Sequence, residues 1–99
     1  MSSLVHEILV CYDIADDKRR TRFFQDLRDL GLTSLQKSVF WGRVRVAEER
    51  ALQHLIRNSL NRETDKAFFM RVALADVIRH TGFGYDDPSL FENKSFDTL

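Results

Sequence analysis

The chain has 99 residues, of which 43% are hydrophobic and 30% are charged, and its formal net charge is zero. This composition is typical of one small globular domain with a modest core, which dimerisation would enlarge, and it excludes a disordered chain. The single cysteine, Cys11, excludes a disulfide framework and a cysteine-based zinc site. The chain has no signal-peptide pattern and no apolar run of the ~20 residues that a membrane span needs, so we expect a cytoplasmic protein.

The charges are unevenly distributed along the chain. Residues 1–17 contain four acidic residues and no lysine or arginine, residues 18–45 contain eight basic and two acidic residues, and residues 85–99 contain four acidic residues and one lysine. A fold that presents the basic segment as one face would attract an anionic partner such as nucleic acid. The alternative is a solvated helix with ordinary surface arginines.

The first predicted elements are a strand and a helix. Residues 7–12 form an almost continuous apolar run, which indicates a central strand. Asp16 and Asp17 then begin a helix, because carboxylates cap the free N–H groups at a helix N-terminus and favour the positive end of its dipole. The helix ends at Gly31. Its apolar stripe consists of Phe23, Leu27 and Leu30.

The second half of the chain continues with alternating strands and helices. The predicted order is a strand region over 35–46, a helix over 47–60, a polar turn over 61–66, a strand over 67–74, a helical turn over 75–80 and a brief strand over 81–84. Gly42 is expected to mark a bulge or bend in the second strand region.

This order predicts an α+β, ferredoxin-like βαββαβ fold over residues 1–84, with both helices on one face of an antiparallel sheet. The two alternating residue sets of the first strand are both apolar, so the other sheet face also needs a cover. A partner sheet in a homodimer is the simplest cover. Residues 85–99 are predicted to be a C-terminal tail that adds a strand to the dimer or to a partner.

Asp13 is the first candidate for chemistry. It follows a buried strand, where a carboxylate is costly unless it is paired or liganded. Mg²⁺ is usually held by one or two carboxylates and several waters, and it can activate water and neutralise charge on a phosphodiester. The alternative is that Asp13 only caps the following turn. Tyr12 is a supporting candidate, with an interface or core aromatic as its alternative.

Arg20 and Arg22 are the main candidates for nucleic-acid binding, and Arg19 and Lys18 are weaker ones. Guanidinium groups stay charged and match the geometry of phosphate. The alternative is ion pairing along the surface of the helix, for example between Arg22 and Asp26.

Three segments in this order and spacing resemble the CRISPR-associated Cas-two family, small proteins of the machinery that captures new spacers. They are Val10–Ile14, Asp16–Arg22 and Gln36–Phe40. The resemblance covers roughly residues 7–84. It implies that Asp13 faces its symmetry mate as the catalytic residue and as the ligand of Mg²⁺ or Mn²⁺.

The third segment adds two site residues by resemblance. Ser38 is implied to bind near the metal or to contact a phosphate of the nucleic acid, and Phe40 is implied to support the site by stacking or by closing the dimer. The alternative for Phe40 is a strand core residue. Ser34 departs from the pattern, because many family members carry a base there, so one phosphate contact is expected to be missing.

The resemblance implies two functions. The first is a subunit for spacer acquisition, in which a homodimer binds duplex DNA by phosphate contacts and bridges dimers of the Cas-one integrase. The alternative is a magnesium-dependent endonuclease that cleaves single-stranded RNA or double-stranded DNA, with Asp13 from both protomers at the metal site. Without the resemblance, a ferredoxin-like domain could also be a small-molecule sensor or an acyl-phosphate hydrolase.

Overall fold

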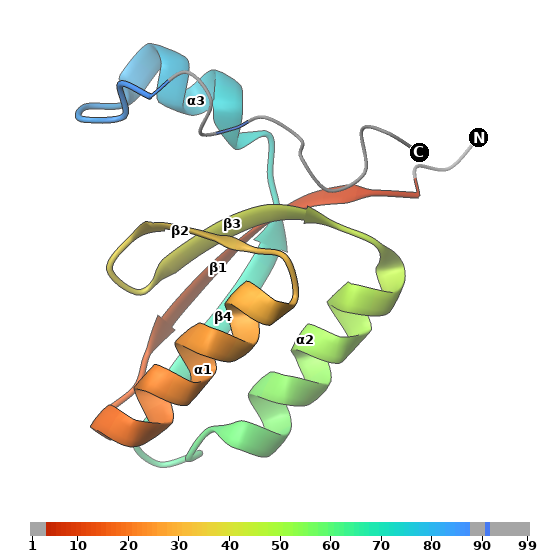
Figure 1. The fold of residues 1–99 in the computed structure, drawn as a ribbon, viewed down its shortest axis with the longest axis vertical. Helices are drawn as coiled ribbons and strands as arrows, with labels where there is room; N and C mark the ends of the chain where they lie inside the picture. The colour runs from red at the N-terminus through yellow and green to blue at the C-terminus, as the bar shows by residue number, and fades with distance from the viewer. Residues whose placement is uncertain (1–3, 88–90, 92–99) are drawn as a thin grey trace.

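The computed structural model describes residues 4–87 and 91. The elements in chain order are β1 (His6–Asp13), α1 (Asp17–Asp29), β2 (Thr33–Gln36), β3 (Val39–Val44), α2 (Val46–Ser59), β4 (Lys66–Arg71) and α3 (Leu74–Thr81). The four strands of this described part form one antiparallel sheet in the order β2-β3-β1-β4. In Figure 1, α1 and α2 cover the same face of the sheet. Helix α3 lies at the other end of the molecule from the start of α1. The predicted ferredoxin-like α+β fold is confirmed.

Strand β1 has two different faces. Ile8, Val10 and Tyr12 are buried, because they point toward the helices and form the centre of the core. Leu9 and Cys11 alternate with them and are half-buried on the other side. We call this second side, which α1 and α2 leave uncovered, the open face of the sheet.

Helix α1 begins and ends where the sequence predicts. The Asp16 carboxylate accepts a hydrogen bond from the Arg19 backbone N–H at 2.8 Å, which caps the helix. Phe23 and Leu27 are fully buried on its inner face. Gly31 follows with a φ of 92°, a left-handed conformation that costs glycine little and turns the chain toward β2.

The predicted strand region over 35–46 is in fact a hairpin. β2 and β3 are separated by Lys37 and Ser38, and Ser38 has a φ of 66°. The irregularity in the pairing lies in β2, between Ser34 and Gln36, so the expected bulge at Gly42 is wrong. The turn of Lys37 and Ser38 contains no glycine or proline, the residues that usually mark a turn in a sequence. The apolar residues on both sides of it were therefore predicted as a single strand.

Gly42 has a different structural reason. It pairs regularly with Ile8, and a Cβ atom at this position would lie 2.6 Å from Cδ2 of the buried Leu32. The backbone Cα of Leu32 would lie 3.3 Å from the same Cβ atom, so a larger residue would have to displace the Leu32 side chain. Glycine at position 42 thus suits the close approach of two segments, and it does not mark a bend.

The C-terminal part of the domain differs most from prediction. β4 ends at Arg71, α3 is a helix of two turns, and the brief strand predicted over 81–84 is wrong, because the helix continues to Thr81 and residues 82–84 follow it without strand pairing. The apolar residues 68, 70, 72 and 74 alternate as in a strand, but the N–H of Leu74 is held by the Glu7 carboxylate at 2.6 Å, which fixes the start of α3.

Most of the predicted C-terminal tail, residues 88–90 and 92–99, lies outside the described residues, so the extra strand expected there stays a prediction. Phe91 is described, and its ring packs edge-on against Trp41 with the ring centres 5.0 Å apart. Within residues 4–87 and 91, no helix combines the length and the hydropathy that crossing a bilayer requires.

Candidate metal and nucleic-acid site

Asp13 lies on the open face of the sheet. It is exposed at the end of β1, and the alternation of the strand places it on the same side as Leu9 and Cys11. Its partner across the β1–β4 ladder is Lys66, whose side chain therefore shares this face. Both residues line a pocket of about 200 Å³ that also includes Phe68. A carboxylate and an ammonium group thus lie side by side at one end of the open face of the sheet.

Lys66 is a neighbour of Asp13 that the sequence does not reveal. It falls in a polar turn with no motif around it, and the two residues are far apart in the chain. Only the antiparallel register between β1 and β4 brings them opposite each other. A cation in this position can pair with an anionic group, such as a phosphate, that approaches this end of the sheet.

Tyr12 points away from Asp13, into the core. It is 8% exposed, and its ring meets Phe23 edge-on at a centroid distance of 5.0 Å. Burial raises the pKa of its hydroxyl, while the nearby positive charge of Arg20 acts in the opposite direction. Its position corresponds to the core-aromatic alternative, and its contribution to the site is to hold the end of β1 in place.

Arg20 joins the start of α1 to the end of β1. Its guanidinium donates a hydrogen bond to the carbonyl oxygen of Ile14 at 2.9 Å and forms an ion pair with Asp17. These contacts hold the group beside the end of the strand that carries Asp13, with part of its surface still accessible to solvent. Arg20 is therefore a positioned cation near the candidate metal ligand.

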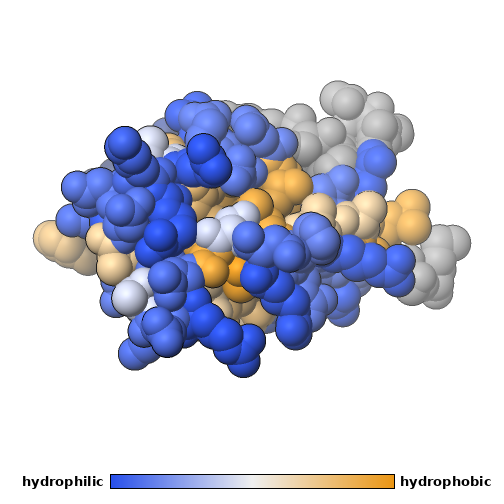
Figure 2. Space-filling model, turned by 90° about the horizontal axis from the view of Figure 1, so that it is seen from below, coloured by the Kyte–Doolittle hydropathy of each residue, from blue (hydrophilic) through white to orange (hydrophobic). Residues whose placement is uncertain are grey.

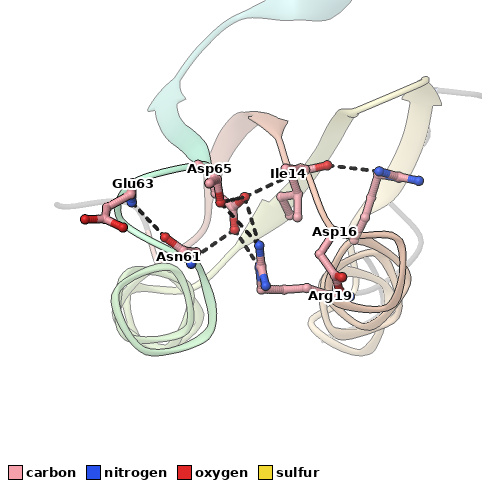
Figure 3. Close-up of polar contacts among 9 residues, drawn as sticks. Ile14, Asp16, Arg19, Asn61, Glu63 and Asp65 are labelled. Carbon is pink, nitrogen blue, oxygen red and sulfur yellow. Dashed lines mark hydrogen bonds and ion pairs between the residues drawn. The ribbon is translucent and has the colours of Figure 1, made fainter.

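Arg19 has a different environment, shown in Figure 3. It forms a two-pronged ion pair with Asp65, with Nε 2.6 Å from Oδ2 and Nη2 3.2 Å from Oδ1. The Asp65 side chain has no exposed surface, and it also accepts hydrogen bonds from the backbone N–H groups of Ala15 and Asn61. This ion pair lowers the pKa of Asp65. Arg19 thus ties the β1–α1 connection to the turn before β4, and its guanidinium is occupied within the protomer.

Asp65 is the second residue whose role the sequence does not reveal. The turn over 61–66 is recognisable, and an asparagine and an aspartate in it indicate local hydrogen bonds to backbone N–H groups. The partner of Asp65, however, lies 46 residues earlier in the chain. No local pattern reveals such a contact.

Lys18 and Arg22 are cations of α1 that take part in none of the ion pairs of the described residues. Both are exposed, and both line a pocket of about 390 Å³ between the start of α1 and the end of α2, together with Asn58 and Ser59. Arg22 makes no ion pair with Asp26, although both residues lie in the described part of the chain, so the i,i+4 alternative is not found. Figure 2 views the molecule from this end and shows a mainly hydrophilic surface around an apolar hollow.

Ser38 and Phe40 take separate positions on β3 and its turn. The Ser38 carbonyl accepts a hydrogen bond from the Tyr12 backbone N–H at 3.1 Å, so Ser38 lies beside the end of β1 and near Asp13. Phe40 is 0% exposed and packs against Phe24 in the core. Its ring is enclosed within the protomer, as the strand-core alternative expects.

A comparison with known families identifies the chain. The family model of CRISPR associated protein Cas2 matches residues 6–77, which is most of the chain and contains all the elements from β1 to β4. The chain belongs to the Cas2 family. The resemblance that the strand-end aspartate, the basic segment and the third segment suggested is therefore confirmed.

Individual relatives agree with this assignment. A CRISPR-associated endoribonuclease Cas2 1 of Francisella tularensis subsp. novicida (strain U112) is 44% identical over 81 residues, which cover 82% of this chain and 82% of the relative. A CRISPR-associated endoribonuclease Cas2 of Korarchaeum cryptofilum (strain OPF8) is 31% identical over 78 residues, covering 79% and 84% of the two chains. The crystal structure of Streptococcus pyogenes Cas2 superposes with a TM-score of 0.65 at 25% identity and covers 79% of this chain and 99% of that one.

A single copy of this Cas2 chain offers few ligands to a metal ion near Asp13. Within the described residues there is no group of three or more His, Cys, Asp or Glu side chains that could hold a metal ion. Asp13 contributes one exposed carboxylate at the end of β1. Mg²⁺ commonly takes one or two protein carboxylates and fills its other positions with water, so two copies of Asp13 fit its donor preference, provided that they approach each other.

Proposed function

We propose that the protein is a homodimeric, metal-dependent endonuclease in which Asp13 of both protomers holds a Mg²⁺ or Mn²⁺ ion. One observation carries the proposal: Asp13 shares the open face of the sheet with exposed apolar side chains. Phe68 and Met70 are 56% and 50% exposed there. Burying them against the same residues of a second copy, about a twofold axis that passes close to the end of β1, would bring the two Asp13 carboxylates together.

Each residue of the site has a role in this proposal. The two Asp13 carboxylates hold the ion, and Arg20 and Lys66 bind the phosphate groups on either side of the bond to be cleaved. Ser38 lies beside the end of β1, where it would contact the sugar-phosphate backbone of the same nucleic acid. A divalent ion bound there supplies charge neutralisation at the phosphodiester and lowers the pKa of a coordinated water.

The relatives named as endoribonucleases make single-stranded RNA the first substrate to test, with double-stranded DNA as the second. The experiment compares the wild-type protein with Asp13→Asn on both substrates, in Mg²⁺, in Mn²⁺ and in EDTA. Loss of a group that merely supports a metal ligand costs about 10- to 100-fold in activity. Loss of the ligand itself is therefore expected to reduce cleavage by more than this range.

Glu63→Gln is the matched control, because Glu63 is an exposed carboxylate whose side chain takes no part in the proposed site. It should cleave like the wild type. Cleavage by Asp13→Asn at the wild-type rate, or cleavage by wild type that persists in EDTA, would contradict the proposal.

A second candidate function is a DNA-binding subunit for spacer acquisition that bridges dimers of the Cas-one integrase. It is favoured by Lys18 and Arg22, which are exposed cations with no acidic partner among the described ion pairs and lie away from the open face. Such cations bind phosphates irrespective of sequence.

The two functions differ in what each variant should lose. For the scaffold, Asp13→Asn should assemble with the integrase and bind duplex DNA normally, whereas Lys18→Glu with Arg22→Glu should weaken DNA binding. The slope of log affinity against log salt should fall by about 1 for each DNA phosphate that the double variant no longer neutralises. Unchanged DNA affinity and slope in this variant would exclude α1 as the DNA-binding surface.

A further inference from the structure

The face of the molecule opposite the proposed dimer interface carries a second pocket that the endonuclease proposal does not use. It has a volume of about 420 Å³ and is lined by residues of α1 and α2 and by Leu30, which follows α1. These two helices cover one face of the sheet (Figure 1). Leu30, Ala51 and Leu55 provide its apolar lining. This volume is in the range of about 300–1,000 Å³ of pockets that enclose a bound group.

The rim of this pocket is acidic on the α1 side. Asp26 and Asp29, three residues apart on one side of the helix, both line it. Asp29 accepts a hydrogen bond from the Gln25 side-chain amide at 3.2 Å, and neither carboxylate is joined to a cation by the ion pairs of the described residues. The opposite rim, on α2, carries His54, Asn58 and Ser59.

These charges decide which class of ligand fits. The pocket adjoins the one that Lys18 and Arg22 line, because Asn58 and Ser59 belong to both. Its charge is opposite, however, since two carboxylates without cationic partners repel the phosphates of a nucleic acid or a small anion. An apolar floor with an acidic rim is complementary to an apolar side chain that is flanked by positive charges.

The pocket is also independent of the proposed dimer. Its helices cover the face of the sheet opposite to the one that carries Asp13, Phe68 and Met70, so a second copy on the open face would leave it accessible.

We propose that this α1–α2 pocket docks a segment of a partner protein in which one apolar side chain is flanked by lysine or arginine. The apolar side chain occupies the space over Leu30, Ala51 and Leu55. Its basic neighbours pair with Asp26 and Asp29.

The probe for the test is a synthetic twelve-residue peptide with a central leucine between two pairs of arginines, compared with the same peptide carrying glutamates in place of the arginines. Binding is measured by fluorescence anisotropy and located by amide chemical-shift changes in ¹⁵N-labelled protein. We expect the arginine peptide to shift the amides of Leu30, Ala51 and Leu55, and the glutamate peptide to leave them unchanged.

The double variant Asp26→Lys, Asp29→Lys should weaken binding of the arginine peptide by about tenfold or more. It should fold normally, because positive charges in the last turns of α1 favour the helix dipole. Glu63→Lys with Asp86→Lys changes the net charge equally at two exposed positions outside the pocket and should bind like the wild type.

A third variant, Ala51→Trp, fills the pocket without changing its charge and should also abolish binding. The proposal is overturned if no peptide shifts the pocket amides at millimolar concentration, or if the arginine peptide shifts other surfaces only. Equal binding of the two peptides, or equal weakening by the control variant, would also overturn it, since either result would reflect general charge attraction.

Discussion

Asp13 and Asp65 lie near the same end of the sheet and have opposite environments. Asp13 is exposed at the end of β1, where its carboxylate is free to bind a ligand. Asp65 is enclosed, with its two oxygens occupied by Arg19 and by backbone N–H groups from two loops. The Asp65 carboxylate stabilises the turn before β4, whereas the Asp13 carboxylate is accessible to a ligand.

The pKa of Asp65 leads to a prediction about stability and pH. It is lowered from the ordinary value of 3.8, first by the hydrogen bond from Arg19. A lowered folded-state pKa stabilises the fold above the unfolded-state value, and this contribution is lost as pH falls through and below about 4. Asp65→Asn should therefore be less stable than the wild type at pH 5 to 7, and the difference should narrow toward pH 3.

Urea unfolding at several pH values measures this difference. Glu63→Gln removes an exposed carboxylate from the same turn. Its difference in unfolding free energy from the wild type should not change in this way between pH 7 and pH 3. A constant difference between Asp65→Asn and the wild type down to pH 3 would mean that the negative charge of Asp65 does not stabilise the folded state.

At the scale of the elements, Glu7 connects the two strands at the centre of the sheet to the C-terminal helix. Its Oε2 accepts a hydrogen bond from the Trp41 indole N–H at 2.8 Å and one from the Leu74 backbone N–H at 2.6 Å. Arg43 lies over the Trp41 ring and donates to the carbonyl oxygen of Phe91. This part of the open face is thus covered by the chain itself, whereas Asp13, Phe68 and Met70 on the same face are exposed.

Glu7→Ala should release α3 from the sheet and leave the buried indole N–H without its acceptor, at a cost of about 1–3 kcal/mol. Trp41 is the only tryptophan and is 3% exposed, so its fluorescence should shift to longer wavelength. Amide hydrogen exchange in Leu74–Thr81 should become faster, while β1 and β3 stay protected. Glu7→Gln, which keeps an acceptor oxygen, should stay close to the wild type; identical exchange in α3 of Glu7→Ala would refute the anchoring role.

At the scale of the whole molecule, the proposed function makes activity depend on assembly through the open face of the sheet. Phe68 and Met70 expose about half of their surface there in the isolated chain. Substituting exposed side chains changes the stability of a monomer by only about 0.5 kcal/mol. Their substitution therefore tests the dimer without unfolding the protomer.

Phe68→Glu with Met70→Glu should convert a dimer into a folded monomer, because four like charges would face one another across the interface. Size-exclusion chromatography with light scattering gives the mass, and circular dichroism reports the fold. Cleavage should fall together with dimerisation, since the two Asp13 carboxylates separate. Phe83→Glu is the control, because Phe83 is 96% exposed and lies outside the sheet. If the variant with both Phe68→Glu and Met70→Glu stayed dimeric and active, the open face would be excluded as the interface.

Much of the architecture was determined by the sequence, because it depends on local periodicity. The apolar run of β1, the cap at Asp16 and the stripe of α1 each act within a few residues, and they were predicted correctly. The position of Asp13 at a strand end follows from the same local pattern. Local information failed where two patterns overlap, as in α3, whose start depends on a carboxylate 67 residues earlier.

Only the tertiary structure decided which of these residues meet. The register of β1 and β4 places Lys66 opposite Asp13, and the folding of two loops onto each other joins Arg19 to Asp65 and leaves Lys18 and Arg22 free. Such contacts depend on the spatial arrangement of distant segments, which no periodicity encodes. The sequence therefore determined the first strand, the two long helices and the family motif. The packing of these helices on one side of the sheet decided that Asp13 lies on the open one.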